Sequence, residues 1–177
     1  PAFTLATIQY LLSQKGKTIN VMMPYSQRLK ALSDWYGQLL AESIGKSEKV
    51  GITPVSALGV TDQHSQLQLY NDGPNNKLII FIEVANQGPD LKIPESITFN
   101  ELMQIEKRAT EQSLTKKSRP NITIKLDSVT EESMGELMML LQCSIAFLGE
   151  FYGIDAFNQP GVELSKKLTK QYVEEIT

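Results

Sequence analysis

Apolar residues recur along the chain at two spacings, which predict helices separated by short strands. Five segments place apolar side chains three or four positions apart, as amphipathic helices do: residues 2–14, 26–44, 99–115, 130–152 and 159–176. Three short runs rich in β-branched and apolar residues are typical of buried strands: residues 18–23, 77–84 and 121–126. This alternation predicts an α/β fold of stacked layers with a mostly parallel sheet, in which residues 77–84 form a central strand.

Two segments are less regular. Residues 46–60 contain Gly51, Thr53, Pro54 and Gly59 without a sustained period, and they are interpreted as a loop. Residues 61–72 are ambiguous, because part of the segment alternates like a strand while its first residues could cap a short helix. Periodicity alone does not decide between the two.

Composition narrows the class of protein. The 177 residues carry 17 Lys and Arg against 20 Asp and Glu, a net charge of −3, which disfavours nucleic acid and anionic lipid as partners. No apolar run reaches the roughly 20 residues of a membrane helix, so a cytoplasmic protein is expected. The lone Cys143 excludes an internal disulfide and a multi-cysteine metal site. A chain that opens on Pro1 and enters a helix at once is interpreted as a fragment.

Glu42 and His64 are the first candidates for acid–base chemistry. Glu42 lies near the carboxyl end of a predicted helix, where a negative charge opposes the helix dipole and is easier to understand if the carboxylate has a task. His64 is the only histidine, and it follows a glycine-containing loop at the start of an element. The alternatives are a solvated helix glutamate and a structural histidine.

Gln159 and Lys166 are the candidates in the last predicted helix. Lys166 flanks the apolar stripe of that helix, although such a lysine commonly only extends its stem along apolar surface. Gln159 precedes Pro160 at the amino end of the helix, where free backbone N–H groups favour an oxygen-rich ligand.

Four separated motifs, taken together, resemble the glucose-6-phosphate isomerases in their bacterial form. The motifs stand in the family's order and span nearly the whole chain: Tyr25–Lys30, Trp35–Lys46, Ala57–Tyr70 with Asp72–Pro74, and Phe157–Lys166. Ser165 and Asn158 depart from the residues that are usual in the last motif. The resemblance implies an SIS-type sugar-isomerase domain, a three-layer α/β sandwich, with residues 1–177 forming the C-terminal portion of a longer protein.

The resemblance also implies an activity and a set of roles. The reaction would be the reversible conversion of glucose 6-phosphate to fructose 6-phosphate, without metal or organic cofactor, in a homodimer. Glu42 matches the family's base, His64 the histidine that assists ring opening, Lys166 the signature lysine, and Gln159 a substrate ligand. The segment after His64 would then be helical. The family's phosphate loop and an arginine would lie in the missing N-terminal portion.

Two further hypotheses stay open beside the isomerase. One is a noncatalytic SIS-type module that binds sugar phosphates, which would need neither Glu42 nor Lys166 beside His64. The other is an obligate association domain, which is compatible with an enzyme whose histidine reaches a neighbouring subunit.

Overall fold

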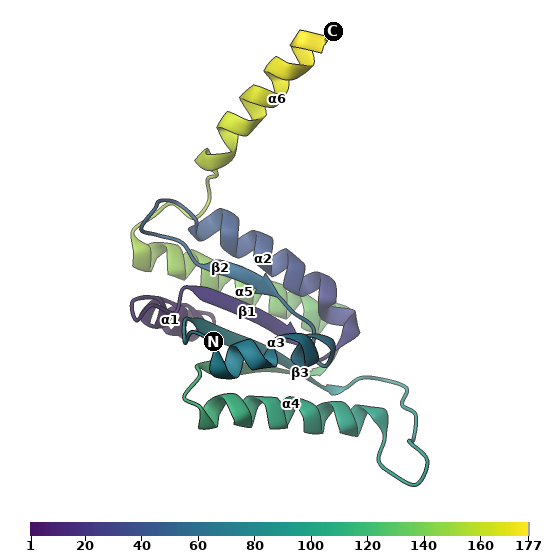
Figure 1. The fold of residues 1–177 in the computed structure, drawn as a ribbon. Coiled ribbons are helices and arrows are strands. Elements are labelled where there is room, and N and C mark those ends of the chain that lie inside the picture. Colours follow the sequence, from purple (N-terminus) through teal and green to yellow (C-terminus); the bar gives the residue numbers. More distant parts are fainter. Residues whose placement is uncertain (177) are drawn as a thin grey trace.

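The computed structural model describes residues 1–176 and is built on four parallel strands in the order β2-β1-β3-β4 (Figure 1). Their bounds are β1 Ile19–Pro24, β2 Thr53–Ser56, β3 Lys77–Asn86 and β4 Asn121–Ser128. Val21 of β1 pairs with Val55 on one side and with Ile79 on the other. The parallel sheet and the internal position of residues 77–84 confirm the sequence-based predictions.

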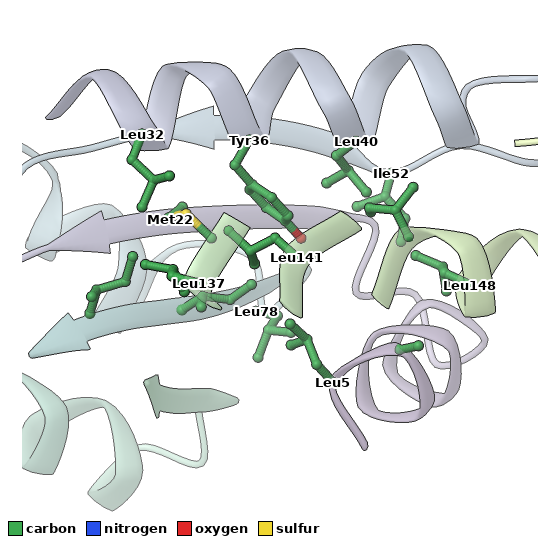
Figure 2. Packing of buried hydrophobic residues seen from close by; sticks show 14 of the residues in the cluster. Leu5, Met22, Leu32, Tyr36, Leu40, Ile52, Leu78, Leu137, Leu141 and Leu148 are labelled. Carbon is green, nitrogen blue, oxygen red and sulfur yellow. The ribbon is translucent and has the colours of Figure 1, made fainter. Parts of the chain in front are cut away.

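Three helices cover one face of the sheet: α1 Ala2–Ser13, α2 Lys30–Ile44 and α5 Glu131–Tyr152. A short 3-10 turn, Gln27–Leu29, precedes α2. Every second residue of β1 and β3 faces these helices, because strand side chains alternate between faces. Tyr36 and Leu141 meet Met22 and Leu78 in this core (Figure 2).

The opposite face carries α3 Thr61–Asp72 and α4 Phe99–Lys116. Val21, Ile79 and Phe81 point to this side and pack with Tyr70 of α3 and Leu114 of α4. Helices on both faces of the sheet make a three-layer α/β sandwich, as predicted.

Two segments of uncertain pattern are resolved by tertiary packing. The prediction of a continuous loop over residues 46–60 is wrong, because Thr53–Ser56 pair with β1 as an edge strand. A four-residue strand is too short to show a period, and Pro54 is tolerated because an edge strand needs partners on one side only. Residues 61–72 are the helix α3.

Helix α1 is held chiefly by α5, from the far end of the chain. Phe3 meets Phe147 edge to face with 5.4 Å between ring centroids, and Tyr10 meets Tyr152 at 5.1 Å. The hydroxyls of Ser13 and Tyr152 are hydrogen-bonded. Aromatic pairs in this geometry add to the stabilisation that burial of their area provides.

The helix α5, Glu131–Tyr152, is also long and apolar enough by composition to span a membrane, with a mean hydropathy of 1.3 over 18 of its residues. Leu137, Leu141 and Leu148 of this helix are buried in the core between the sheet and α2. A third of the apolar window is buried within the sandwich, while Met139 and Phe147 are 58% and 40% exposed.

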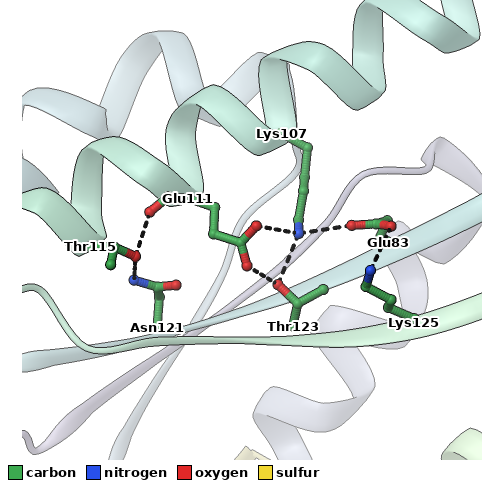
Figure 3. Close-up of polar contacts among 7 residues, drawn as sticks. All are labelled: Glu83, Lys107, Glu111, Thr115, Asn121, Thr123 and Lys125. Atoms are coloured by element: carbon green, nitrogen blue, oxygen red, sulfur yellow. Dashed lines mark hydrogen bonds and ion pairs between the residues drawn. The ribbon is translucent and has the colours of Figure 1, made fainter.

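A buried lysine connects α4 to the sheet (Figure 3). The Lys107 side chain is 2% exposed, and its Nζ lies 2.9 Å from carboxylate oxygens of both Glu83 and Glu111. It also donates to the Thr123 hydroxyl at 2.9 Å, while Thr123 donates to Glu111 at 2.6 Å. Lys125 approaches Glu83 from outside at 3.6 Å. A buried charge needs such a set of partners.

The last helix, α6 Glu163–Ile176, follows a 3-10 turn at Pro160–Val162 and extends away from the sandwich (Figure 1). None of its residues is buried.

The Gly153 residue that ends α5 adopts a left-handed conformation, φ 64°, which glycine reaches without strain.

Candidate active site

Glu42 and Gln159 meet directly, although 117 positions separate them in sequence. The Gln159 Nε2 donates to Glu42 Oε2 at 2.8 Å, and Gln38 Nε2 of the preceding turn donates to Glu42 Oε1 at 3.0 Å. The Glu42 side chain is half-buried. A carboxylate has about four lone-pair sites, so two hydrogen bonds fix its orientation and leave lone pairs that can take a proton.

The residues after Glu42 fasten the C-terminal segment to this end of α2. Lys46 Nζ donates to the Glu42 carbonyl at 2.9 Å and to the Asn158 carbonyl. The Lys46 cation offsets the negative charge at this end of α2, which comes from the helix dipole and from the Glu42 carboxylate. Gly45 permits the turn, because a Cβ at this position would lie 2.7 Å from the Ala41 carbonyl oxygen.

The segment that carries Gln159 is shaped by one aspartate. Asp155 accepts hydrogen bonds from the Phe157 N–H at 2.8 Å and from the Asn158 amide at 2.7 Å. This local turn, together with Lys46, aims Gln159 at Glu42. Gln159 is therefore placed by its loop and not by an end of α6.

His64 lies in the first turn of α3, and the loop before it is held by two contacts. The Leu58 N–H donates to Asp62 Oδ2 at 2.7 Å, and Gly59 packs so closely on the Tyr25 ring that a Cβ would lie 2.4 Å from it. Tyr25 in turn donates its hydroxyl proton to Gln63 Oε1 at 2.6 Å, and burial raises its pKa to about 12.

The imidazole itself is exposed and stands over a hollow between α3 and α4. The hollow has a volume of about 520 Å³, and Gln63, Gln68, Asn71 and Glu106 line it beside His64. Within residues 1–176, the imidazole nitrogens have no hydrogen-bond partner. The ring is therefore available to a group from outside the chain.

Glu42 and His64 lie at opposite ends of the parallel strands, Glu42 at the amino ends and His64 at the carboxyl ends. The amino end of α2 lies at the carboxyl ends of the strands. Lys30 and Ser33 contact Ser56 there, and Ser56 is the last residue of β2. The helix α2 runs antiparallel to the strands for 15 residues, about 22 Å. Glu42, near its carboxyl end, therefore lies at the amino ends of the strands. His64 lies in the first turn of α3, which follows the carboxyl end of β2 along the chain. One small substrate cannot touch both side chains of a single chain.

Lys166 stands apart from both groups. It lies on α6, is 66% exposed, and pairs with Glu163 at 2.9 Å. The structure thus joins Glu42 with Gln159 and leaves His64 and Lys166 separate. No three His, Cys, Asp or Glu side chains within residues 1–176 gather into a group that could hold a metal ion.

Comparison with known proteins identifies the family. A family model described as phosphoglucose isomerase matches residues 92–177. A glucose-6-phosphate isomerase of Carboxydothermus hydrogenoformans is 48% identical, over 96% of this chain and 40% of the relative. The chain belongs to the phosphoglucose isomerase family. It spans about 40% of the length of the relatives it matches.

A further relative of the phosphoglucose isomerase family and two solved structures are also similar to this chain. A glucose-6-phosphate isomerase of Rubrobacter xylanophilus is 42% identical over 96% of this chain and 42% of its own length. The crystal structure of a hypothetical protein of Thermus thermophilus superposes with a TM-score of 0.89 at 36% identity, over 95% of this chain and 44% of that one. A glucose-6-phosphate isomerase of Chlamydia trachomatis has the same fold, with a TM-score of 0.83 at 22% identity over 97% of this chain and 38% of its own.

Sequence reasoning missed the residues that support Glu42 in this member of the phosphoglucose isomerase family. Lys46 and Gln38 were within reach, because both lie four positions from Glu42 on a predicted helix and its end. The contacts of Asp155 and Asn158 with this segment depend on a return of the chain from α5, which no local pattern reveals.

Proposed function

We propose that the protein containing this chain interconverts glucose 6-phosphate and fructose 6-phosphate. The observation that carries the proposal is the hydrogen bond between Gln159 and Glu42, which joins two distant motifs in a member of the phosphoglucose isomerase family. A carboxylate fixed beside an amide donor suits an aldose–ketose shift, since that reaction needs a positioned base and hydrogen bonds to sugar hydroxyls.

The proposed base is Glu42. After ring opening, its carboxylate removes the proton from C2 of the sugar, and the C1 carbonyl oxygen gains a proton to give a cis-enediol. Return of the proton to C1 and loss of a proton from the C2 hydroxyl yield the ketose. Gln38 and Gln159 keep the carboxylate oriented through the transfer.

The other three site residues have supporting roles in this proposal. Gln159 binds a substrate oxygen, since its amide already reaches the Glu42 carboxylate. His64 assists ring opening, for which an exposed imidazole without a hydrogen-bond partner within residues 1–176 is suited. Lys166 meets the substrate from α6 once that helix is packed against the rest of the protein.

The chain is proposed to be the C-terminal portion of its protein, with the N-terminal portion supplying the grip on the substrate phosphate and the stabilisation of the enediolate. The length of the relatives, of which the chain spans about 40%, supports this division. We place the protein in the cytoplasm, where its sugar-phosphate substrate is found.

The test is a coupled dehydrogenase assay on two samples, the full-length protein and the 177-residue chain alone. Turnover of glucose 6-phosphate is expected from the full-length protein only, because the chain alone lacks the proposed phosphate site. A full-length protein that binds the sugar phosphate in calorimetry without turning it over would instead be a noncatalytic binding module, and the isomerase proposal would be wrong.

A homodimer is expected as well. Glu42 and His64 of one chain lie at opposite ends of the strands, and a second copy would bring its His64 to the Glu42 of its partner. The contact should be isologous, around a twofold axis. Sedimentation of the full-length protein at micromolar concentration should give the mass of a dimer. A strict monomer with full activity would contradict this arrangement.

A further inference from the structure

The turn of α3 that presents His64 has few anchors of its own. Tyr70, near the far end of the helix, is the only buried residue of α3. Within residues 1–176, no side chain caps the amino end of the helix. The Leu58 N–H does bond the Asp62 carboxylate, but both residues belong to the same segment. Because a short helix owes most of its stability to packing, this end of α3 depends on contacts with the rest of the fold.

Tyr25 supplies such a contact from the sheet. It follows β1 directly, and its N–H donates to the Ile82 carbonyl of β3 at 2.8 Å. The Tyr25 carbonyl accepts from Gln87 Nε2 at 2.6 Å. The side chain is fully buried, with its ring centroid 6.0 Å from that of Phe81. Tyr25 is therefore fixed at the carboxyl ends of β1 and β3.

The Tyr25 hydroxyl reaches the residue beside His64. It donates to Gln63 Oε1 at 2.6 Å. Burial raises the pKa of Tyr25 to about 12, so at neutral pH the hydroxyl keeps the proton that it donates. The loop before α3 is held at the same place, since the Gly59 N–H donates to the Pro24 carbonyl at 2.9 Å. Gln63 and His64 line one hollow, so this hydrogen bond ties the wall of that hollow to the end of β1.

We propose that Tyr25 is a positioning residue for His64. Its hydroxyl holds Gln63, and Gln63 fixes the helical turn that carries the imidazole. The effect on turnover rests on the proposed function, in which His64 assists ring opening, whereas the placement of the turn does not. A misplacement of about 1 Å can cost about 10²-fold in rate, so a hydrogen bond one residue away from His64 is close enough to affect catalysis.

A double-mutant cycle in the full-length protein tests whether Tyr25 acts through His64. Tyr25→Phe removes the hydroxyl and keeps the ring, and it should lower kcat about 10- to 100-fold while KM changes less than about twofold. In a His64→Ala background the same substitution should cost less than about twofold, because residues that act as one unit are not additive. Additive losses of kcat would show that Tyr25 does not act through His64.

Tyr70→Phe is the matched control. The Tyr70 hydroxyl bonds Gln66 within α3, and the Tyr70 side chain is also buried, so this variant loses the same kind of hydrogen bond from the same helix. Its kcat should stay within about twofold of the parent's, because the bond lies away from His64. Urea unfolding measures the stability that each variant loses. Equal losses of kcat in Tyr25→Phe and Tyr70→Phe would reduce Tyr25 to a structural role and overturn the proposal.

Hydrogen exchange of residues 58–65 in the full-length protein measures the placement of the turn without any assay of turnover. Protection should fall at least about tenfold in Tyr25→Phe and in Gln63→Ala, which removes the acceptor of the same bond, and should persist in Tyr70→Phe. Unchanged protection in both Tyr25→Phe and Gln63→Ala would overturn the proposal. Lost protection in a protein without turnover would uphold the positioning and reject the isomerase function, and turnover with an additive cycle would do the reverse.

Discussion

Replacing Glu42 by Gln in the full-length protein should lower the rate of isomerisation about 10²- to 10⁴-fold, the usual loss when a general base is removed. This corresponds to roughly 3 to 5 kcal/mol of transition-state stabilisation. A glutamine keeps the size of the side chain and one acceptor oxygen. It can therefore still accept from Gln38 or Gln159, but it has no carboxylate to take the C2 proton.

The measurement is exchange of the C2 hydrogen with solvent deuterium, alongside calorimetric titration with the sugar phosphate. Affinity should change far less than the exchange rate, because the carboxylate acts mainly in the transition state. Gln38→Ala is the control, since it removes one hydrogen bond to Glu42 and spares the base. Exchange at the parent's rate in Glu42→Gln, or an equal loss of binding and rate, would mean that Glu42 is not the base.

The second large effect is on stability. Lys107→Met should destabilise the 177-residue chain by about 2 to 4 kcal/mol, somewhat below the usual cost of breaking a buried ion pair because the carboxylates are partly exposed. Glu83 and Glu111 are 22% and 31% exposed and would lose the cation that both contact at 2.9 Å. Urea unfolding followed by circular dichroism measures the change.

The pH dependence of this loss follows from the two carboxylates. Hydrogen bonds and charge from Lys107 hold the pKa of Glu83 below its ordinary value of 4.5. Partial burial would raise the pKa of Glu111, but hydrogen bonds from Thr123 and Lys107 lower it below 4.5. A depressed carboxylate pKa stabilises the fold above the ordinary pKa, and the benefit is lost as pH falls through the lower, folded value. The difference between parent and Lys107→Met should thus be complete near neutral pH and shrink below about pH 4.5.

Two further variants test the same cluster. Lys125→Met removes a lysine that is 74% exposed and 3.6 Å from Glu83, so it should cost under about 1 kcal/mol. The triple variant Lys107→Met, Glu83→Gln, Glu111→Gln should recover most of the stability, since it leaves no unpaired charge. A Lys107→Met chain as stable as the parent at neutral pH would show that the cluster contributes nothing.

The sequence predicted the elements whose pattern is local. The strand at residues 77–84 and the helices at 99–115 and 130–152 have long runs of one period, and capping boxes at Thr98 and Thr130 begin both helices. Strand β2 was missed because its four residues are ordered by pairing with β1 and not by their own pattern. Lys107 could have been noticed, since it lies four residues after Met103 and seven before Leu114 on a helix face that packs on the sheet.

The site divides in the same way. Glu42 and His64 were predicted as acid–base candidates from their residue types and from their positions, at the carboxyl end of a helix and after a glycine-containing loop. The motifs around them resembled one family. Their placement at opposite ends of the parallel strands depends on how the chain connects the strands of the sheet, which periodicity does not encode. The contact between Gln159 and Glu42 likewise depends on where the chain returns after α5.

The packing of α1 against α5 has a consequence for biosynthesis. About 120 residues separate the two helices, and ribosomes add about 5 to 20 residues per second, so α1 waits roughly 6 to 24 s for its partner to be made. During that interval Phe3, Tyr10 and the other apolar side chains of α1 are displayed on a nascent chain. Within residues 1–176, the helix that is made first is thus among the last to be buried, and the interval is one in which a molecular chaperone has most to bind.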